Sequence, residues 1–225
     1  ITSKENEQIK QIRKLKDKKY RDEKGLYIIE GVKTINEAIE EDANIETIVI
    51  CDDCEKQGTL DQKLLYEVAK YNLIYVNEKV FGYITEVMNP QGILAVVSKK
   101  EKKKINYNED IIVVLDNIQD PGNLGTIIRS AVAFNFDTII IGKNTVDIYN
   151  EKVLRASEGM IYNINIIKDD LVHSIMDLKL KGYKILGTKV DNGKSIDEIN
   201  SSKYAFIVGN EGNGISDDIL NLCDD

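Results

Sequence analysis

The sequence predicts an α/β protein of two domains, the second built on a largely parallel sheet. Short runs of strand-forming residues alternate with stretches of helical periodicity along nearly the whole chain. Two runs, 111–115 and 138–141, are almost continuously β-branched, which suits strands covered on both faces. Residues 98–109 (SKKEKKKINYNE) show neither pattern. We therefore expect a first domain at 1–97, a linker at 98–109 and a second domain at 110–225.

The first domain opens with a basic segment and then alternates strands with helices. Its strand-forming runs are LYIIEG from Leu26, IETIVIC from Ile45, LIYV from Leu73 and ILAVVS from Ile93. The helical stretches that separate them are VKTINEAIEE from Val32, LDQKLLYEVAKY from Leu60 and NEKVFGYITEV from Asn77. This order indicates a compact α/β domain.

The second domain repeats the alternation without an internal sequence repeat. Its strand-forming runs are IIVVLD from Ile111, TIIIG from Thr138, NINII from Asn163, YKILGT from Tyr183 and YAFIV from Tyr204. Helices are expected over 124–135, 149–156 and 170–181, and a last one is expected to begin near Ile215.

The composition is that of a soluble protein. The net charge is −8, with 42% hydrophobic and 30% charged residues. No apolar run approaches the roughly 18 residues of a membrane span, and no signal peptide opens the sequence. Three cysteines without a disulfide pattern are typical of a reducing compartment. We expect a cytoplasmic protein.

Basic side chains are concentrated in two segments, which matters because contacts with RNA phosphates need Lys and Arg. Residues 10–24 hold eight basic and three acidic side chains, and residues 99–104 read KKEKKK. The first segment is either an RNA contact or a solvated helix face. The second is either an RNA contact or a linker extended by self-repulsion. For the first segment we favour RNA contact, through Lys14, Lys18, Lys19 and Arg21.

Two glycine-rich turns carry the strongest functional signal. They read NIQDPGNLGTIIR (117–129) and FIVGNEGNGIS (206–216), and each follows a strand-forming run. Glycines let the backbone approach a ligand closely, and ligands of open α/β sheets lie outside the carboxyl ends of the strands. If the two strands are neighbours, the turns form one site. Polar side chains that a plain turn would not need are Asn117, Asp120, Asn123, Arg129, Asn210 and Glu211.

These turns resemble two motifs of the SpoU (TrmH-like) RNA ribose 2′-O-methyltransferases of the SPOUT superfamily. The first, N-x-x-D-P-x-N-x-G-x-x-x-R, runs here from Asn117 to Arg129, and the second, G-x-E-x-x-G-[IL], runs from Gly209 to Ile215. The stretch VLRASEGM (153–160) is similar to the R-A-S-x-G segment that such proteins carry between the two motifs.

The resemblance is close over 110–225 and looser over 1–97. In the first domain YIIEGVKTINEAI (27–39) carries it, and is similar to the small ribosomal-protein-like substrate-binding domain that often precedes SpoU catalytic domains. The resemblance therefore implies a small α/β RNA-binding domain followed by a SPOUT-type parallel-sheet catalytic domain.

The function that the resemblance implies is S-adenosylmethionine-dependent methylation of a ribose 2′-hydroxyl in ribosomal or transfer RNA, by a homodimer without a metal ion. The catalytic residues would be Arg129, Asn123 and Glu211. The cofactor-binding residues would be Leu186, Gly187, Thr188, Gly209, Asn210 and Gly212. Further RNA contacts would be Arg155 and Ser157.

Several of these residues have a second interpretation. Asn123 either caps the helix that follows it, for which Asn is well suited, or belongs to the site. Glu211 is interpreted as the hydrogen-bond acceptor for Asn123 or Arg129. Arg155 and Ser157 contact RNA or only shape the dimer. For Arg129 we favour positioning and charge stabilisation over proton abstraction, because a guanidinium stays protonated.

SpoU proteins carry a third motif, of the I-P-M…S-L-N type, which supplies much of the adenosine pocket and closes a trefoil knot. The sequence ends at LNLCDD (220–225) without such a stretch. We expect the catalytic domain to be truncated at its C-terminus and the knot to be incomplete. The alternative function is a non-catalytic RNA-binding protein that retains the methyltransferase fold.

Other motifs do not meet the requirements of the chemistry they suggest. GNEGNG (209–214) reverses the glycine spacing of a dinucleotide-binding loop, and GTKVDNGKS (187–195) has one residue too many for a P-loop. Cys51 and Cys54 form CDDC, but a structural zinc site needs four ligands, and only Cys223 and the sole histidine, His173, remain.

Overall fold

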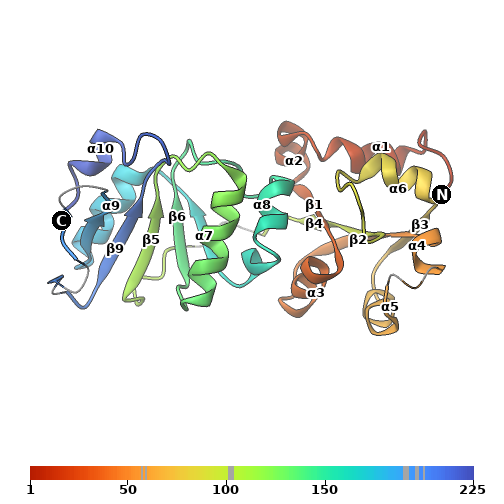
Figure 1. The fold of residues 1–225 in the computed structure, drawn as a ribbon, viewed down its shortest axis with the longest axis horizontal. Coiled ribbons are helices and arrows are strands. Elements are labelled where there is room, and N and C mark those ends of the chain that lie inside the picture. Colours follow the sequence, from red (N-terminus) through yellow and green to blue (C-terminus); the bar gives the residue numbers. More distant parts are fainter. Residues whose placement is uncertain (57, 59, 101–103, 190–192, 196–197, 200) are drawn as a thin grey trace. The chain divides into compact units, whose positions relative to one another are not determined.

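The computed structural model describes residues 1–225 except 57, 59, 101–103, 190–192, 196–197 and 200. The chain forms two compact units (Figure 1). The first comprises Ile1–Glu101 and Asp147–Tyr162, and the second comprises Lys102–Val146 and Asn163–Asp225. Residues 147–162 thus group with the first unit, although the division made from the sequence assigns them to the second domain. No helix in the described ranges is long and apolar enough to span a membrane.

The first unit is built on a four-stranded mixed sheet. Its strands, in spatial order, are β1 (Leu26–Glu30), β4 (Ile93–Ser98), β2 (Ile45–Cys51) and β3 (Leu73–Val76). Strands β1 and β2 are both antiparallel to β4, and β3 is parallel to β2. The helices are α1 (Glu7–Lys14), α2 (Lys18–Lys24), α3 (Val32–Glu40), α4 (Asp52–Lys56), α5 (Gln62–Val68), α6 (Glu78–Ile84) and α8 (Glu151–Ala156). The four predicted strands are all present.

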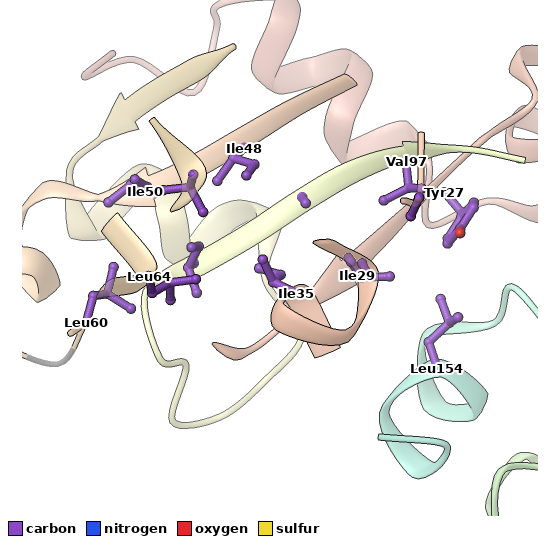
Figure 2. Packing of buried hydrophobic residues seen from close by; sticks show 14 residues of the cluster. Tyr27, Ile29, Ile35, Ile48, Ile50, Leu60, Leu64, Val97 and Leu154 are labelled. Carbon is purple, nitrogen blue, oxygen red and sulfur yellow. The ribbon is translucent and has the colours of Figure 1, made fainter. Parts of the chain in front are cut away.

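Helices cover both faces of this sheet, because successive strand residues point to opposite sides. On β2, Ile48 and Ile50 belong to one core with residues of α3 and α5, whereas Val49 belongs to another core with residues of α1 and α6. Figure 2 shows the first of these cores. It includes Leu154, which comes from α8 and lies on the side of Tyr27 and Ile29.

The segment 147–162 is held in the first unit by polar as well as apolar contacts. A guanidinium nitrogen of Arg21 donates to Asp147 Oδ2 at 2.8 Å, and both side chains of this pair are largely buried. The Tyr27 hydroxyl donates to that of Tyr162 at 3.1 Å, and the rings of Tyr27 and Tyr149 lie 4.5 Å apart. This short segment therefore completes the core of the first unit.

Replacing Arg21 with alanine is expected to destabilise the protein by about 3 kcal/mol, because it leaves Asp147 as a buried carboxylate without its partner. Chemical denaturation followed by circular dichroism measures the change. The control is Lys18→Ala, which removes a more exposed ion pair with Asp22 and should cost at most about 1 kcal/mol. Equal effects of the two substitutions would contradict the structural importance of the buried pair.

The second unit contains a five-stranded sheet in which all neighbouring strands are parallel, as predicted. Its strands, in spatial order, are β7 (Asn165–Lys168), β6 (Thr138–Ile141), β5 (Ile111–Leu115), β9 (Tyr204–Val208) and β8 (Lys184–Gly187). Its helices are α7 (Pro121–Ala133), α9 (Leu171–Leu180) and α10 (Asp217–Leu220). Helix α10 begins two residues later than expected, because Ile215 packs into the core ahead of it.

Both faces of the parallel sheet are covered, in agreement with its β-branched strands. Ile112 and Val114 of β5 belong to a core shared with α9 and α10. Helix α7 lies across the opposite face (Figure 1), where its buried residues Leu124 and Ile128 form the apolar side. The carboxyl ends of β5 and β9 lie side by side, since Leu115 pairs in register with Val208.

Candidate functional site

The two glycine-rich turns meet at the carboxyl edge of the parallel sheet. The first follows β5 and the second follows β9, and these strands are hydrogen-bonded neighbours. From the sequence, one site is expected if the two turns follow neighbouring strands, and they do. The end of β8 lies at the same edge, because Gly187 pairs in register with Ile207 of β9.

The first turn places Asn123 inside the helix rather than at its cap. Asp120 is the N-cap of α7, and its Oδ1 accepts a hydrogen bond from the Asn123 backbone N–H at 2.8 Å. Pro121 takes the first helical position, where its missing N–H has no cost. Because Asp120 does the capping, the interpretation of Asn123 as the helix cap is wrong, and its side chain is available for another partner.

That partner is Glu211 in the second turn. Asn123 Nδ2 donates to Glu211 Oε1 at 2.8 Å, across 88 positions of sequence. Of the two donors that the sequence left open for Glu211, the structure shows Asn123 at its carboxylate. Both side chains are exposed, so the bond lies at the surface of the sheet edge, where a ligand can reach it.

The second turn is shaped by Asn210. Its Oδ1 accepts from the backbone N–H groups of Gly212 and Asn213, at 2.9 and 3.0 Å. Its Nδ2 donates to the carbonyl oxygen of Asn117 in the first turn at 3.0 Å. Asn210 and Gly214 also exchange two backbone hydrogen bonds of 2.8 Å. The turn is therefore closed on itself and tied to its neighbour.

Gly209 and Gly212 occupy different environments within this turn. A Cβ atom at Gly209 would lie 2.3 Å from the Gly214 carbonyl carbon and 2.3 Å from the Ile215 nitrogen, so only glycine fits. At Gly212 the nearest neighbour of an added Cβ would be Asn210 Oδ1, at 3.5 Å. The backbone of the protein thus explains Gly209, whereas at Gly212 a Cβ would fit with an ordinary contact.

Arg129 lies in the body of α7, exposed and away from the buried stripe formed by Leu124, Ile128 and Ala131. This is the placement expected from helical periodicity. It follows Asn123 on the same helix, so one rigid element carries both side chains. The sequence signal for Arg129 was the motif, since exposure alone does not distinguish it from a solvated arginine.

At the end of β8, Leu186 is buried, and Gly187 and Thr188 are half-buried. The Thr188 hydroxyl and backbone N–H both donate to the carbonyl oxygen of Ile207, at 2.9 and 3.1 Å. The Gly187 N–H donates to the carbonyl oxygen of Asp225 at 2.8 Å. This segment is consequently fixed alongside the strand that leads into Gly209.

The residues predicted to bind RNA fall into two groups within the first unit. Lys14, Lys18 and Lys19 are exposed on α1 and α2. Arg21 is buried, and its guanidinium donates to the carbonyl oxygens of Leu15 and Lys16 as well as to Asp147. Arg21 is therefore a structural residue, and the prediction that it contacts RNA is wrong.

Ser157 also does not fit its predicted contact with RNA. It is fully buried, and its hydroxyl donates to the carbonyl oxygen of Leu154 at 2.9 Å, at the end of α8. A buried hydroxyl with an intrahelical partner is not positioned to contact RNA. Arg155, two residues earlier, is exposed.

Arg155 lies at a pocket for which the sequence gives no signal, because the residues that line the pocket are far apart in the chain. The pocket is lined by Lys16, Ile28, Ile29, Glu30, Thr34, Ile84, Glu86, Glu151, Leu154 and Arg155. The pKa of Glu151 is raised to about 7. Burial is the main cause and a hydrogen bond with Glu86 the second, whereas the positive charge of Arg155 acts in the opposite direction. The same hydrogen bond lowers the pKa of Glu86. The carboxylates compensate part of the charge of Arg155, which weakens the case for a phosphate contact there.

The sequence also raised a cysteine pair, metal ligation and a P-loop-like stretch. Cys51 and Cys54 form no disulfide. The pKa of Cys54 is raised to about 12, with burial as the main cause and a hydrogen bond to Cys51 as the second. No group of three or more His, Cys, Asp and Glu in the described part of the chain is placed to hold a metal ion. In the P-loop-like stretch, Lys194 pairs with Asp225, and residues 190–192 lie outside the described residues.

Comparison with known proteins agrees with the two motifs. Residues 110–225 match the model of the SpoU rRNA Methylase family, and residues 6–95 match the MRM3-like substrate binding domain. The chain belongs to the SpoU rRNA methylase family. One relative is the 23S rRNA (guanosine(2553)-2′-O)-methyltransferase RlmP of Bacillus subtilis, which is 32% identical over 225 residues, covering 100% of this chain and 87% of that protein.

Other relatives are similar over a shorter span or in structure. The mitochondrial rRNA methyltransferase 3 of Xenopus tropicalis is 31% identical over 78% of this chain and 42% of its own length. The AdoMet-bound rRNA methyltransferase from Sinorhizobium meliloti superposes with a TM-score of 0.83 at 26% identity, covering 99% of this chain and 85% of that one. A structure described as an RNA 2′-O ribose methyltransferase gives 0.84 at 25% identity, covering 100% and 86%. The predicted fold class is confirmed by these neighbours.

Proposed function

We propose that this protein transfers a methyl group from S-adenosylmethionine to a ribose 2′-hydroxyl of ribosomal RNA. The observation that carries the proposal is the hydrogen bond of 2.8 Å from Asn123 to Glu211. It joins the two SpoU motifs at the carboxyl edge of adjacent parallel strands, where open α/β sheets bind their ligands. The activity named for the relatives from Bacillus and Sinorhizobium supports the same reaction.

Arg129 is assigned to the acceptor side of the reaction. Its guanidinium stays protonated, so it orients the ribose and stabilises negative charge that develops on the attacking 2′-oxygen. Asn123 and Glu211 hold the two turns in a fixed relation through their hydrogen bond. The hydroxyl proton leaves to water or to a substrate phosphate, because a protonated guanidinium cannot accept it.

The edge formed by β8 and β9 is assigned to the cofactor. When bound there, S-adenosylmethionine supplies an electrophilic methyl group on its sulfonium. The residues present fit such a ligand, because an added atom at Gly212 would make only an ordinary contact, of 3.5 Å with Asn210 Oδ1, and the half-buried backbone of Gly187 and Thr188 runs alongside Ile207. The cofactor-binding set is then Leu186, Gly187, Thr188, Gly209, Asn210 and Gly212.

The first domain, residues 1–97, is assigned to RNA binding, and 110–225 to catalysis. Lys14, Lys18 and Lys19 are the proposed phosphate contacts, since they are exposed and lie in the most basic segment. Homodimeric assembly and a cytoplasmic location complete the proposal. The resemblance to SpoU enzymes supports the homodimer, and the cysteine usage supports the cytoplasmic location.

The test is methyl transfer from labelled S-adenosylmethionine to ribosomal RNA that lacks the modification, followed by mapping of 2′-O-methyl positions. We expect label at a ribose 2′-oxygen of a defined nucleotide. RNA that is bound without incorporation of label would instead support a non-catalytic RNA-binding protein. Labelled transfer RNA without labelled ribosomal RNA would change the substrate but keep the reaction.

Neutralising Lys14, Lys18 and Lys19 together is expected to flatten the salt dependence of RNA binding, by up to roughly one phosphate contact per lysine. Fluorescence anisotropy over a series of salt concentrations measures the slope. A matched control replaces the exposed lysines Lys63, Lys70 and Lys79, which changes the net charge equally. Identical slopes for both triple variants would remove α1 and α2 from the RNA interface.

A further inference from the structure

A buried carboxylate holds the far end of the second turn. Asp116 directly follows β5 and is 8% exposed. Its Oδ2 accepts a hydrogen bond from the Ser216 backbone N–H at 2.7 Å, across 100 positions of sequence. A carboxylate that accepts a backbone N–H forms one of the stronger hydrogen bonds in proteins. Asp116 lies outside the motif residues assigned to the site.

Asp116 and its neighbour Asn117 together hold the turn at both ends. The Asn117 carbonyl oxygen accepts from Asn210 at the start of the turn, and Asp116 accepts from Ser216 at its end. Asn117 takes a left-handed backbone conformation, with φ of 62°, which is uncommon for a residue other than glycine. The chain after β5 is thus bent at the place where it meets the second turn.

The turn held in this way carries the groups proposed to act. Glu211 lies inside it and accepts from Asn123, and the N–H groups of Gly212 and Asn213 are aligned by Asn210. The bond to Ser216 adds the constraint at the other end of the same loop, where Ile215 enters the core. Without that constraint the loop backbone gains freedom that a ligand must remove on binding.

We propose that Asp116 is a positioning residue that preorganises the cofactor-binding turn, through the Ser216 N–H and without contact to substrate. The inference rests on the proposed function, because it assigns the turn at 209–216 to S-adenosylmethionine. The inference predicts different effects on the KM for the cofactor and on kcat. Loss of Asp116 raises the KM for the cofactor and leaves kcat at saturating cofactor within about threefold, whereas a partly unfolded enzyme shows a lower kcat with an unchanged KM.

Three variants of the full chain test the inference. Asp116→Ala removes the acceptor. Asp116→Asn keeps an acceptor oxygen of the same shape without the charge. Ser216→Pro removes the donor N–H instead. Proline suits the φ of −63° at Ser216, and its ring takes the place of the N–H hydrogen and displaces the Asp116 carboxylate. The control is Glu109→Ala, which removes a half-buried carboxylate at the opposite, amino end of β5, where it accepts from Thr138.

Each variant is measured for cofactor binding by calorimetry, for the KM and kcat of methyl transfer, and for amide hydrogen exchange over 209–216. For Asp116→Ala and Ser216→Pro we expect at least about tenfold weaker S-adenosylmethionine binding, the scale for losing a charge-assisted hydrogen bond. Faster exchange at Gly212 and Asn213 should accompany it. Asp116→Asn should recover most of the affinity, and Glu109→Ala should bind the cofactor like wild type.

If wild type binds S-adenosylmethionine and both Asp116→Ala and Ser216→Pro bind it equally tightly, the inference is overturned and the proposed function stands. A loss confined to kcat would overturn the inference in the same way. A wild-type protein that binds no S-adenosylmethionine would overturn the proposed function and the inference together. If Asp116→Ala fails to fold, Ser216→Pro carries the same decision, since it breaks the same hydrogen bond from the donor side.

Discussion

Arg129→Ala is expected to lower the rate of methyl transfer by about 10² or more and to leave S-adenosylmethionine binding nearly unchanged. The guanidinium acts on the 2′-oxygen when charge develops there, so its loss affects the reaction more than the binding of the cofactor. Arg129→Lys keeps the positive charge but loses the planar fork of donors, and should restore only part of the rate. Single-turnover transfer and calorimetry measure the two quantities.

The control for Arg129 is Ser130→Ala, an exposed neighbour on the same helix α7. It should change neither quantity by more than about twofold, because it leaves the arginine and the helix in place. If Arg129→Ala abolished cofactor binding but spared turnover at saturating cofactor, the assignment of acceptor and cofactor sides would have to be exchanged.

Gly209→Ala is expected to abolish cofactor binding and to destabilise the second unit, whereas Gly212→Ala should weaken binding without a loss of stability. At Gly209 the new Cβ would collide with the backbone of Gly214 and Ile215 at 2.3 Å, and a backbone in a closed turn has little room to move. At Gly212 the new methyl group meets only Asn210 Oδ1, at an ordinary contact distance of 3.5 Å. Any lost affinity at Gly212 then comes from the ligand.

Denaturant unfolding and calorimetry on the two glycine variants separate these effects. A Gly209→Ala protein with wild-type stability would show that the turn opens more easily than its geometry indicates. Gly212→Ala with wild-type affinity would show that S-adenosylmethionine does not approach this side of the turn. From the sequence, both glycines have the same explanation, close approach to the cofactor. For Gly209 the contact with the protein's own backbone is the stronger reason.

The local signals in the sequence determined the elements of the fold and the pair of functional turns. Alternating strand and helix patterns depend on neighbours within about ten residues, and the continuous runs in β5 and β6 indicated a sheet covered on both faces. The two turns were recognisable because each combines glycines with polar side chains directly after a strand. Their meeting then required only that β5 and β9 be neighbours.

Tertiary structure alone decided which partner each polar side chain takes. Asp120 and Asn123 are both good capping residues, and only the fold shows that Asp120 caps α7 while Asn123 reaches Glu211. A basic run does not reveal that Arg21 is turned inward, since its acceptors include Asp147, 126 positions away. The placement of 147–162 in the first unit depends on equally distant contacts, such as that of Leu154 with the first core. Hydrogen bonds and ion pairs act over a few ångströms in space, so a pattern that reports neighbours in sequence cannot specify them.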